Sequence, residues 1–560
     1  MKIYTLLFFL LITSVTNAQV QDLFERESDY HHFNGNVLVQ TSNSINYEAS
    51  FGYADLEQEI SFQKYTRFDI GSLTKQFTAA AILHLVHVGK INTDDPINDH
   101  LGSFANNKWT KVTIHQLLTH TSEIPSIYQT EQGLDIFFPQ EQRIDLKDLI
   151  AKFSAGKLIS SPGKEFNYSN SGYVLLAAII ENVSGISFED YLQTKLFDAY
   201  GLENTSFLPD SNSALPYFGY LPANIERAPL YHYSWSIGAG GVYSTTHDLS
   251  TWVEVITGDN FLTPELRETF ITNHTKDLGN VGYGYGWQIT REGIVEHDGG
   301  TYGFISFLSF DPNTKDHHVL LTNRSFESIN DFGKSGSKIR SLSNNIWDLK
   351  SGREIEIHPQ RSEHKIASDS ILLDSGEQLL IQQSERGNYV FYSGSNLSEI
   401  IPNTPVAPDS ELNKKVLNIA NHLEKGQYWR FASYCNGEMK FVAYSGLFRL
   451  GFGPMKKRVG DNLELIPFLV YESSAMLRMK GANGSLHLIV YFNEEGKVMG
   501  VYDRDFYSPK VPRKMKAYPI GKNQLFIDGF PYGENSATLT LKNDSVVIEQ
   551  FGREVSFKEK

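Results

Sequence analysis

The stretch of sequence that most constrains the fold is residues 77–88, where almost every position is apolar or small. Its apolar residues recur at helical spacing, and Gly89 follows as the helix end. A helix of this composition has hardly any polar face to present to solvent, so we predict that it is buried nearly all round. The chain must therefore build a core on every side of this helix, which holds its first turn rigidly.

Ser72 and Lys75 lie immediately ahead of this helix. Side chains three positions apart in a helix share one face, so the Lys75 amine can reach the Ser72 hydroxyl. A serine hydroxyl becomes an effective nucleophile when a neighbouring base removes its proton, which makes acyl transfer possible. The spacing alone does not identify the nucleophile, because Ser-x-x-Lys occurs six times, beginning at Ser61, Ser72, Ser154, Ser161, Ser335 and Ser362.

Tyr168 and Asn170 follow the turn at residues 162–163 and precede an apolar helix pattern at residues 174–180. They are therefore expected on a loop just before a helix, where catalytic groups often lie. A phenol near an ammonium can transfer protons, and a carboxamide two residues on can orient a lysine or a substrate amide. The alternative is structural, with Tyr168 as a turn aromatic and Asn170 as a helix cap.

Residues 287–289 and 294–306 alternate apolar and polar positions around a central turn, which predicts a hairpin. Its second arm carries His297, Gly299 and Gly300. The glycines let a ligand approach the backbone closely, and an exposed amide there can serve as an oxyanion donor. His297 can donate to a substrate carbonyl or carboxylate, although a histidine at a strand end also serves structural roles.

Together, these three stretches carry a family resemblance. Ser72-Leu73-Thr74-Lys75, Tyr168-Ser169-Asn170 and His297-Asp298-Gly299 resemble, in order, the three motifs of the serine beta-lactamase and penicillin-binding-protein superfamily. The similarity is greatest to its class C-like branch, which also holds esterases and D-aminopeptidases. Flanking sequence matches as well, at Gly52–Asp55, Leu117–Ser122 and Gly240–Thr245. The resemblance covers residues 30–345.

The resemblance implies an α+β fold: an antiparallel sheet covered by helices and an all-helical lobe, with the active site between them. It implies that Ser72 is the acylated nucleophile and that Lys75 and Tyr168 share the work of general base and acid. Asn170 would position the lysine and the substrate amide. The backbone N–H groups of Ser72 and Gly300 would form the oxyanion hole. No metal or organic cofactor is implied.

Two departures from the family pattern bear on the substrate. Many members begin the third motif with a lysine that binds the substrate carboxylate, whereas this chain has His297, followed by the negative Asp298. The second departure is Glu123, where a glycine usually follows the Leu117–Ser122 run. We therefore expect His297 and Gly299 to contribute to a site for a small-molecule ester, amide or peptide substrate. A general hydrolase is favoured over an antibiotic-destroying enzyme.

The alternative to a hydrolase is a binding or sensing protein that keeps this fold and is acylated without turnover. Both interpretations share the three motifs, because deacylation depends on where a water molecule lies. Nucleic acid and anionic membrane surfaces are disfavoured as partners by the formal net charge of −15. A metal role is also disfavoured, since no histidine cluster has zinc-ligand spacing. The oligomeric state is unknown from the sequence.

The N-terminus is predicted to be an export signal, residues 1–18. Lys2 supplies a positive start, residues 6–12 an apolar core, and cleavage is expected after Ala18. No later segment reaches the roughly 20 apolar residues of a membrane helix, which predicts a soluble periplasmic or secreted protein. Cys435 is the only cysteine, so no internal disulfide can form.

A change in composition after about residue 348 predicts a domain boundary. Residues 351–370 are polar and charged, which suits a linker, and later residues are rich in strand and turn patterns. The predicted organisation is a hydrolase domain at 19–350, a linker at 351–370 and an accessory α+β, β-rich region at 371–560. Within that region, a helix at 413–431 and a later hairpin suggest a small α+β module at 413–503.

Overall fold

The structure is a computed structural model, and it describes the greater part of the first 360 residues and the regular elements of the rest. The described residues are 17–30, 32–41, 46–127, 141–218, 225–275, 281–325, 335–355, 357, 359–360, 369–372, 378–383, 389–393, 411–425, 427–435, 464–470, 474–482, 484–492, 497–503, 514–521, 524–528, 537–542, 545–550 and 553–558.

The chain divides into two compact units, Met1–Gln360 and Arg361–Lys560. The predicted linker at residues 351–370 spans this division, and its residues 361–368 lie outside the described ones. Most of the predicted export signal also lies outside them, and the described chain begins in a helix at residues 17–29. The boundaries of the accessory region stay a prediction.

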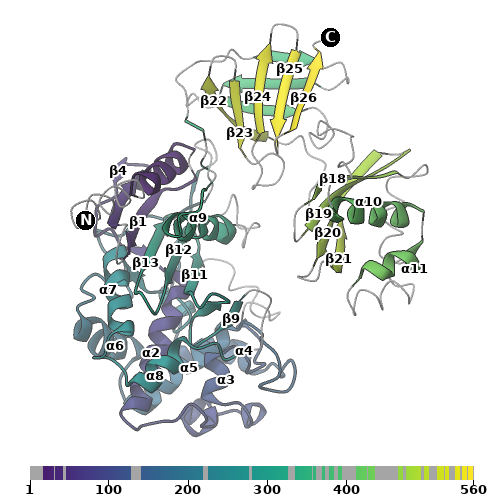
Figure 1. The fold of residues 1–560 in the computed structure, drawn as a ribbon. Coiled ribbons are helices and arrows are strands. Elements are labelled where there is room, and N and C mark those ends of the chain that lie inside the picture. Colours follow the sequence, from purple (N-terminus) through teal and green to yellow (C-terminus); the bar gives the residue numbers. More distant parts are fainter. Residues whose placement is uncertain are drawn as a thin grey trace, which may run out of the picture. The chain divides into compact units, whose positions relative to one another are not determined.

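A seven-stranded antiparallel sheet forms the centre of the first unit, in the order β2-β1-β13-β12-β11-β10-β9 (Figure 1). Its strands are β1 (Gly35–Gln40), β2 (Asn46–Phe51), β9 (Val281–Tyr283), β10 (Gln288–Thr290), β11 (Val295–Thr301), β12 (Phe304–Phe310) and β13 (His317–Thr322). Strands from both ends of the unit therefore share one sheet, which confirms the antiparallel sheet expected from the sequence.

Both faces of this sheet are buried. Along β12, Ile305 and Phe307 face one hydrophobic cluster, whereas Phe304 and Leu308 face another, as the alternation of side chains in a strand requires. The first face is covered by the helix at residues 17–29 and by α9 (Ser335–Lys350), which crosses β11–β13 in Figure 1. The second face packs on the helical part of the unit, so the sheet is the middle of three layers.

The helical lobe lies between β2 and β9 in the chain. Its helices are α2 (Thr74–His87), α3 (Ile114–Leu118), α4 (Leu146–Ser154), α5 (Asn170–Ser184), α6 (Phe188–Leu192), α7 (Thr246–Thr257) and α8 (Pro264–Ile271). Short strands complete the unit: β3 (Tyr53–Asp55), β4 (Ile60–Ser61), β5 (Phe68–Asp69), β6 (Tyr217–Phe218), β7 (Glu226–Arg227), β8 (Tyr243–Ser244) and β14 (Arg324–Ser325).

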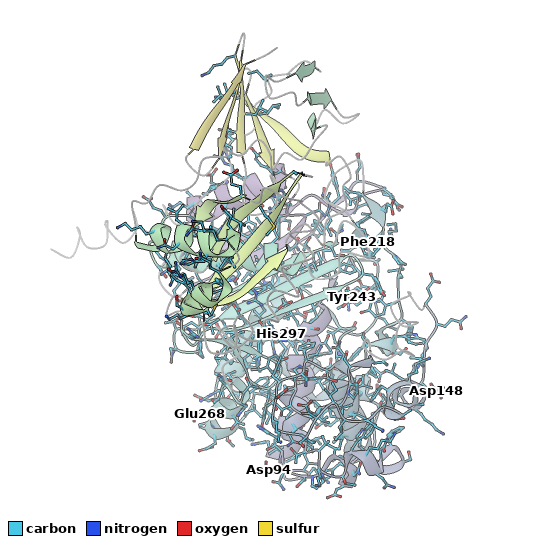
Figure 2. All side chains as sticks on the ribbon, turned by 90° about the vertical axis from the view of Figure 1, so that its right-hand side faces the viewer. Asp94, Asp148, Phe218, Tyr243, Glu268 and His297 are labelled. Atoms are coloured by element: carbon cyan, nitrogen blue, oxygen red, sulfur yellow. The ribbon has the colours of Figure 1, made fainter. Side chains whose placement is uncertain are left out.

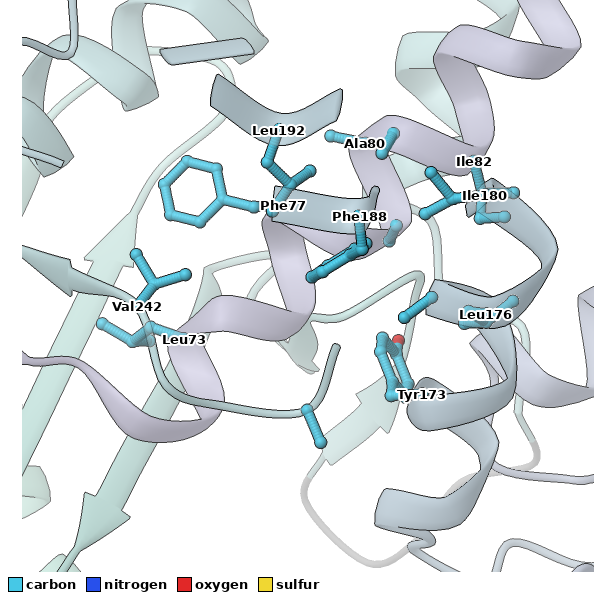
Figure 3. Close-up of a cluster of buried hydrophobic side chains, with 14 of the residues drawn as sticks. Leu73, Phe77, Ala80, Ile82, Tyr173, Leu176, Ile180, Phe188, Leu192 and Val242 are labelled. Atoms are coloured by element: carbon cyan, nitrogen blue, oxygen red, sulfur yellow. The ribbon is translucent and has the colours of Figure 1, made fainter. Parts of the chain in front are cut away.

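Helix α2 is the centre of this lobe, and the prediction that it is buried nearly all round is confirmed. Every residue from Thr74 to Leu83 is buried, and Gly89 follows the helix with a positive φ of 72°. Figure 3 shows Phe77 and Ala80 of α2 among side chains of α5 and α6, including Leu176 and Leu192. The first turn of α2 is thus fixed by packing on several sides.

The predicted hairpin is confirmed, because β10 pairs antiparallel with β11, but its second arm, residues 294–306, is not a single strand. Strand β11 ends at Thr301 and β12 begins at Phe304, with Gly303 between them at a φ of 81°. A side chain at Gly303 would also overlap Pro216. The turn is needed because β12 runs back along β11 into the middle of the sheet.

Strand β11 approaches the start of α2 unusually closely, and glycines make this possible. A Cβ atom on Gly299 would overlap the Ile70 carbonyl oxygen and the Ser306 hydroxyl, and one on Gly71 would lie 2.8 Å from the Gly300 nitrogen. Gly300 differs, since a Cβ there meets only the Ile305 Cδ1 atom, at 3.5 Å. Side chains are therefore excluded at two positions where the sheet meets the turn before α2.

The described residues of the second unit form two antiparallel sheets. The eight-stranded sheet comprises, in spatial order, β15 (Asp369–Leu372), β16 (Gln378–Gln383), β17 (Tyr389–Ser393), β22 (Lys514–Gly521), β23 (Gln524–Asp528), β24 (Ala537–Lys542), β25 (Ser545–Gln550) and β26 (Arg553–Lys558). The four-stranded sheet comprises β18 (Glu464–Val470), β19 (Ser474–Gly481), β20 (Gly484–Phe492) and β21 (Val498–Asp503).

The smaller sheet and its helices form an insertion, because β17 pairs directly with β22 across that whole stretch of chain. The predicted helix at 413–431 is two helices, α10 (Glu411–Glu424) and α11 (Tyr428–Phe431). The sequence between them contains Gly426, and glycine disfavours a continuous helix. The predicted hairpin at the end of the module corresponds to β20 and β21, which two earlier strands extend into a sheet.

Exposed charged side chains such as Asp94, Asp148 and Glu268 lie at the edges of the first unit, whereas His297 lies inside it (Figure 2).

Within the described part of the chain, no single helix combines the length and hydropathy needed to cross a membrane. Helix α5 and the helical segment Phe188–Tyr200 reach the required length and hydropathy only when they are taken together, and the two are bent by 78° relative to each other.

The close approach of β11 predicts that Gly299→Ala destabilises the protein much more than Gly300→Ala. The added methyl group at position 299 overlaps backbone and side-chain atoms, and such overpacking costs about 1–3 kcal/mol or more. At position 300 the methyl has space, so the change is expected to stay below about 1 kcal/mol. Urea unfolding of the two variants measures the difference, and equal losses would contradict the described packing.

Candidate active site

Ser72 lies in the short 3₁₀ turn Gly71–Leu73 that leads directly into α2. The turn is held in place because the Gly71 backbone N–H donates to Asp69 Oδ1 at 2.9 Å. Ser72 is partly exposed while its neighbours Gly71 and Leu73 are buried. The fold therefore offers one hydroxyl to solvent from an otherwise buried segment.

Lys75 reaches this hydroxyl as the sequence spacing predicts. Its Nζ atom lies 2.9 Å from Ser72 Oγ and donates a second hydrogen bond to the Ala239 carbonyl oxygen at 2.8 Å. The amine also lies 5.0 Å from the ring centre of Tyr168 and 5.6 Å from that of Tyr173.

The Lys75 amine is fully buried, and this burial lowers its pKa well below the usual 10.5. The negative charge of Asp298 opposes that shift. A lower pKa means that a larger fraction of the amine is neutral at ordinary pH. The neutral amine can accept the proton of the Ser72 hydroxyl, which is what a general base needs.

Tyr168 contacts the same hydroxyl. Its phenol donates to Ser72 Oγ at 3.1 Å from the loop that precedes α5. Its ring packs on the His120 imidazole in a tilted arrangement, with a centroid separation of 4.2 Å and an interplanar angle of 36°. The structure thus brings together the three residues predicted to be catalytic, of which Tyr168 is far from the other two in the sequence.

Asn170 is the first residue of α5, and its backbone N–H donates to Ser126 Oγ at 3.4 Å. Among the described residues, its carboxamide makes no hydrogen bond to Lys75. The Ala239 carbonyl oxygen is the lysine's second partner instead. The predicted contact between Asn170 and the lysine is therefore absent here, and its contact with a substrate amide stays a prediction.

The third motif lies on β11, with Gly299 and Gly300 against the Ser72 turn. The Gly300 nitrogen would lie 2.8 Å from a Cβ atom on Gly71, so its N–H group belongs to the immediate surroundings of the nucleophile. Gly300 is exposed in a strand that is otherwise mostly buried. This placement suits the predicted pair of oxyanion donors, the backbone N–H groups of Ser72 and Gly300.

His297 is buried and has partners inside the protein for both ring nitrogens. Nδ1 lies 2.6 Å from the Asp298 carbonyl oxygen, and Nε2 lies 2.9 Å from the Tyr283 hydroxyl. Burial lowers the pKa of His297 to about 4, so the ring is neutral at ordinary pH. Donation to a substrate, as predicted from the sequence, would require His297 to give up one of these bonds.

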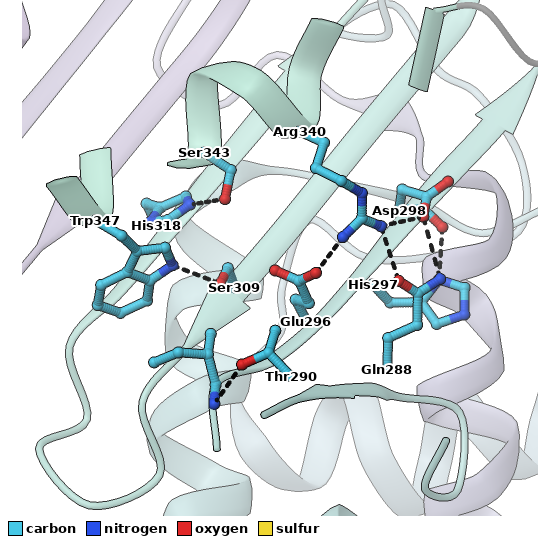
Figure 4. Close-up of polar contacts among 11 residues, drawn as sticks. Gln288, Thr290, Glu296, His297, Asp298, Ser309, His318, Arg340, Ser343 and Trp347 are labelled. Carbon is cyan, nitrogen blue, oxygen red and sulfur yellow. Dashed lines mark hydrogen bonds and ion pairs between the residues drawn. The ribbon is translucent and has the colours of Figure 1, made fainter. Parts of the chain in front are cut away.

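A cation that the sequence pattern did not indicate stands beside the third motif. Arg340 of α9 donates to Asp298 Oδ1 at 3.0 Å and to Gln288 Oε1 at 2.7 Å, and it also pairs with Glu296 (Figure 4). Nothing local in the sequence connects Arg340 with the motif, because the contact depends on α9 packing over the sheet. The guanidinium charge is shared between two carboxylates of β11.

Glu123, the departure from the usual glycine, keeps the backbone conformation that glycine favours. Its φ is 62°, a left-handed value that costs free energy for a residue with a side chain. The side chain is buried and its Oε2 accepts from Asn167 Nδ2 at 2.7 Å. The Glu123 side chain therefore adds a hydrogen bond to the loop that carries Tyr168.

The described residues contain no group of three or more histidine, cysteine or carboxylate side chains arranged to hold a metal ion. Two residues that the sequence did not single out as site residues, His120 and Tyr283, are hydrogen-bonded to the motifs. Both side chains are buried. Their aromatic and polar character gave no local signal for this role, since the contacts join distant segments.

Residues 20–332, more than half of the chain, match the family described as Beta-lactamase. Penicillin-binding protein 4* of Bacillus subtilis is 30% identical over 314 residues, which are 52% of this chain and 68% of that protein. Protein flp of Staphylococcus aureus is 26% identical, over 57% of this chain and 65% of its own length. This chain thus spans about two thirds of the length of these curated relatives.

Solved structures show the same fold. The penicillin binding protein from Bacillus halodurans is 26% identical with a TM-score of 0.50, over 58% of this chain and 99% of that one. EstCE1, described as a hydrolase with promiscuous acyltransferase activity, is 21% identical with a TM-score of 0.53, over 60% of this chain and 100% of its own. The chain belongs to the beta-lactamase family, within the serine beta-lactamase and penicillin-binding-protein superfamily.

Proposed function

We propose that this protein is an exported serine hydrolase that forms an acyl-enzyme at Ser72 with an ester or amide substrate. One observation carries the proposal: Ser72 Oγ lies 2.9 Å from the buried Lys75 amine and 3.1 Å from the Tyr168 phenol. A hydroxyl placed between a base of lowered pKa and a second proton-transfer group is an activated nucleophile. The similarity to solved hydrolases supports the same chemistry.

The proposed reaction follows from these contacts. Neutral Lys75 takes the proton from Ser72 Oγ as that oxygen attacks the substrate carbonyl carbon, and the backbone N–H groups of Ser72 and Gly300 stabilise the resulting oxyanion. The tetrahedral intermediate then expels the alcohol or amine, which takes a proton from Tyr168 or Lys75. Water next attacks the acyl-enzyme carbonyl, its proton passes to the same pair, and the acid product leaves with Ser72 restored.

The surroundings of the third motif favour a substrate without an obligatory carboxylate. His297 is neutral, buried and engaged, so it offers no fixed positive charge. The nearby Arg340 is already paired with Glu296 and Asp298. We therefore place simple esters and amides, including D-amino-acid amides, ahead of beta-lactams as substrates.

The second candidate is a binding or sensing protein that is acylated without turnover. Its acylation would use the same contacts of Ser72 with Lys75 and Tyr168, and its deacylation step would be slow. The two candidates differ in whether product formation continues after the first turnover.

The proposal predicts the effect of removing the nucleophile and the base. Ser72→Ala is expected to abolish labelling by a fluorophosphonate probe, and Lys75→Met to slow it about 10²–10⁴-fold, the usual contribution of a general base. Mass spectrometry locates the label and stopped-flow absorbance follows turnover of p-nitrophenyl acetate. A single burst without sustained turnover favours the sensor, and labelling that survives in Ser72→Ala refutes the assigned nucleophile.

The lowered pKa of Lys75 predicts a pH profile for acylation. The general base must be neutral, so the rate rises with pH through the lowered pKa and is constant well below pH 10.5. It falls on the acid side as the amine becomes protonated. The rate constant for probe labelling, measured from pH 5 to pH 10, checks this expectation. A rate that keeps rising up to pH 10 would show that burial does not deprotonate the lysine.

Export is proposed from the sequence of the first 18 residues, with Lys2 and the apolar residues 6–12 before Ala18. Cleavage after Ala18 is predicted to leave Gln19 as the first residue of the mature protein. N-terminal sequencing of the full-length protein, expressed in a bacterium and recovered from outside the cytoplasm, checks this position. An intact Met1 on the recovered protein would contradict it.

A further inference from the structure

A continuous chain of hydrogen bonds links residues of the second and third motifs next to the candidate active site. The Ser169 backbone N–H lies 3.1 Å from His120 Nδ1, and His120 Nε2 lies 3.1 Å from the Tyr283 hydroxyl. The Tyr283 hydroxyl lies 2.9 Å from His297 Nε2, and His297 Nδ1 lies 2.6 Å from the Asp298 carbonyl oxygen. The three side chains in the middle of this chain are all buried.

The two ends of the chain fix the direction of every bond in it. A backbone N–H can only donate, so His120 Nδ1 accepts from Ser169 and the ring's proton must be on Nε2, which donates to Tyr283. A carbonyl oxygen can only accept, so His297 carries a proton on Nδ1. Because burial lowers the pKa of His297 to about 4, the ring is neutral and its Nε2 accepts. The single hydroxyl proton of Tyr283 therefore points to His297, and both imidazoles are neutral.

The backbone conformation of His120 is unfavourable. Its φ is 56°, a left-handed value that is uncommon for a residue with a side chain. Such a conformation persists only where surrounding contacts fix it. Besides the two hydrogen bonds, the His120 ring packs on Tyr168 at 4.2 Å and on Tyr173 at 5.1 Å between ring centres.

The chain joins the segments that carry the second and third motifs. His120 follows α3, Ser169 directly follows Tyr168, Tyr283 ends β9, and His297 begins the third motif on β11. We propose that His120 is a positioning residue of this active site, and that His120, Tyr283 and His297 form one neutral chain that fixes Tyr168 and β11 relative to Ser72.

This role explains the histidine in the third motif differently from anion binding. His297 is the acceptor of the chain, so its imidazole orients β11 from within the protein. The proposed role of the chain depends on the proposed function in one respect, because its effect on activity is measured as the rate of acylation of Ser72. Protonation of either ring would place two donors face to face, and the charged or titratable groups around the rings are Lys75, Tyr168, Tyr173, Asp298 and Arg340.

Tyr283→Phe tests the chain, with Tyr285→Phe as its matched control. Both tyrosines are 1% exposed. Tyr283 hydrogen-bonds the two histidines of the chain, whereas Tyr285 hydrogen-bonds one histidine outside it, His115. We expect Tyr283→Phe to lower the acylation rate constant at saturating p-nitrophenyl acetate about tenfold, with unchanged ester binding, and Tyr285→Phe to change it less than twofold. Equal effects of the two variants would overturn the proposal.

The double variant His120→Gln/Tyr283→Phe tests whether these residues act as one unit. If they do, the combined loss in acylation rate is no larger than the larger of the two single losses. Losses that multiply would show that the residues act independently and would overturn the proposal. Thermal unfolding of each variant shows whether a loss of rate follows from loss of the fold.

Nitrogen NMR of the protein labelled with ¹⁵N-histidine tests the chain without any activity. His120→Gln and His297→Gln assign the ring signals. We expect His120 to carry its proton on Nε2 and His297 on Nδ1, with both rings neutral at pH 6. The opposite tautomers would overturn the chain whatever the substrate is. Expected tautomers together with no labelling of Ser72 would instead overturn the proposed function alone.

Discussion

The structure depends on the burial of one amine. Lys75 stands in the first turn of a helix that is packed on all sides, so its charged form loses the hydration that water would give it. The free energy that this desolvation costs is offset by the packing of α2 as a whole, whose apolar side chains fill the centre of the helical lobe. The same packing that makes the lysine a base also holds it 2.9 Å from its serine.

The elements around Lys75 are arranged so that the sheet can approach the buried amine and its serine. Gly71 and Gly299 remove side chains where the sheet meets the turn of Ser72, so that β11 reaches the nucleophile. On the other side of β11, Arg340 neutralises the carboxylates of Glu296 and Asp298. Asp298 therefore stays close enough to influence Lys75 while its own charge is partly balanced. The third motif therefore contributes backbone groups and internal hydrogen bonds to the site, and its neighbouring cation Arg340 is paired with carboxylates.

Local patterns in the sequence were sufficient for the elements that depend on neighbouring residues. The burial of α2 and the loop position of Tyr168 both follow from spacing and turn residues. The family motifs then placed Ser72, Lys75 and Tyr168 together. Asn170 was expected beside the lysine, but a carbonyl oxygen of a distant loop, that of Ala239, takes this place.

What the sequence could not reveal depends on contacts between distant segments. Arg340 meets Asp298 only because α9 lies across the sheet, and Tyr283 meets His120 only because β9 lies next to the turn after α3. The strand pairing of β17 with β22 is of the same kind, since it spans an entire inserted sheet. Apolar alternation likewise did not show where β11 ends and β12 begins, because both are buried on both faces.

The pairing of β1 with β13 has a consequence for how the protein folds. Gly35 is matched with Thr322, so the central strands meet only after nearly the whole first unit has been synthesised. Closing so long a loop costs conformational entropy before the contacts that stabilise the sheet can form. Folds dominated by contacts between residues distant in sequence therefore form slowly. The nascent chain therefore spends an extended period without its sheet, and the helical lobe cannot acquire its final support until the last strands arrive.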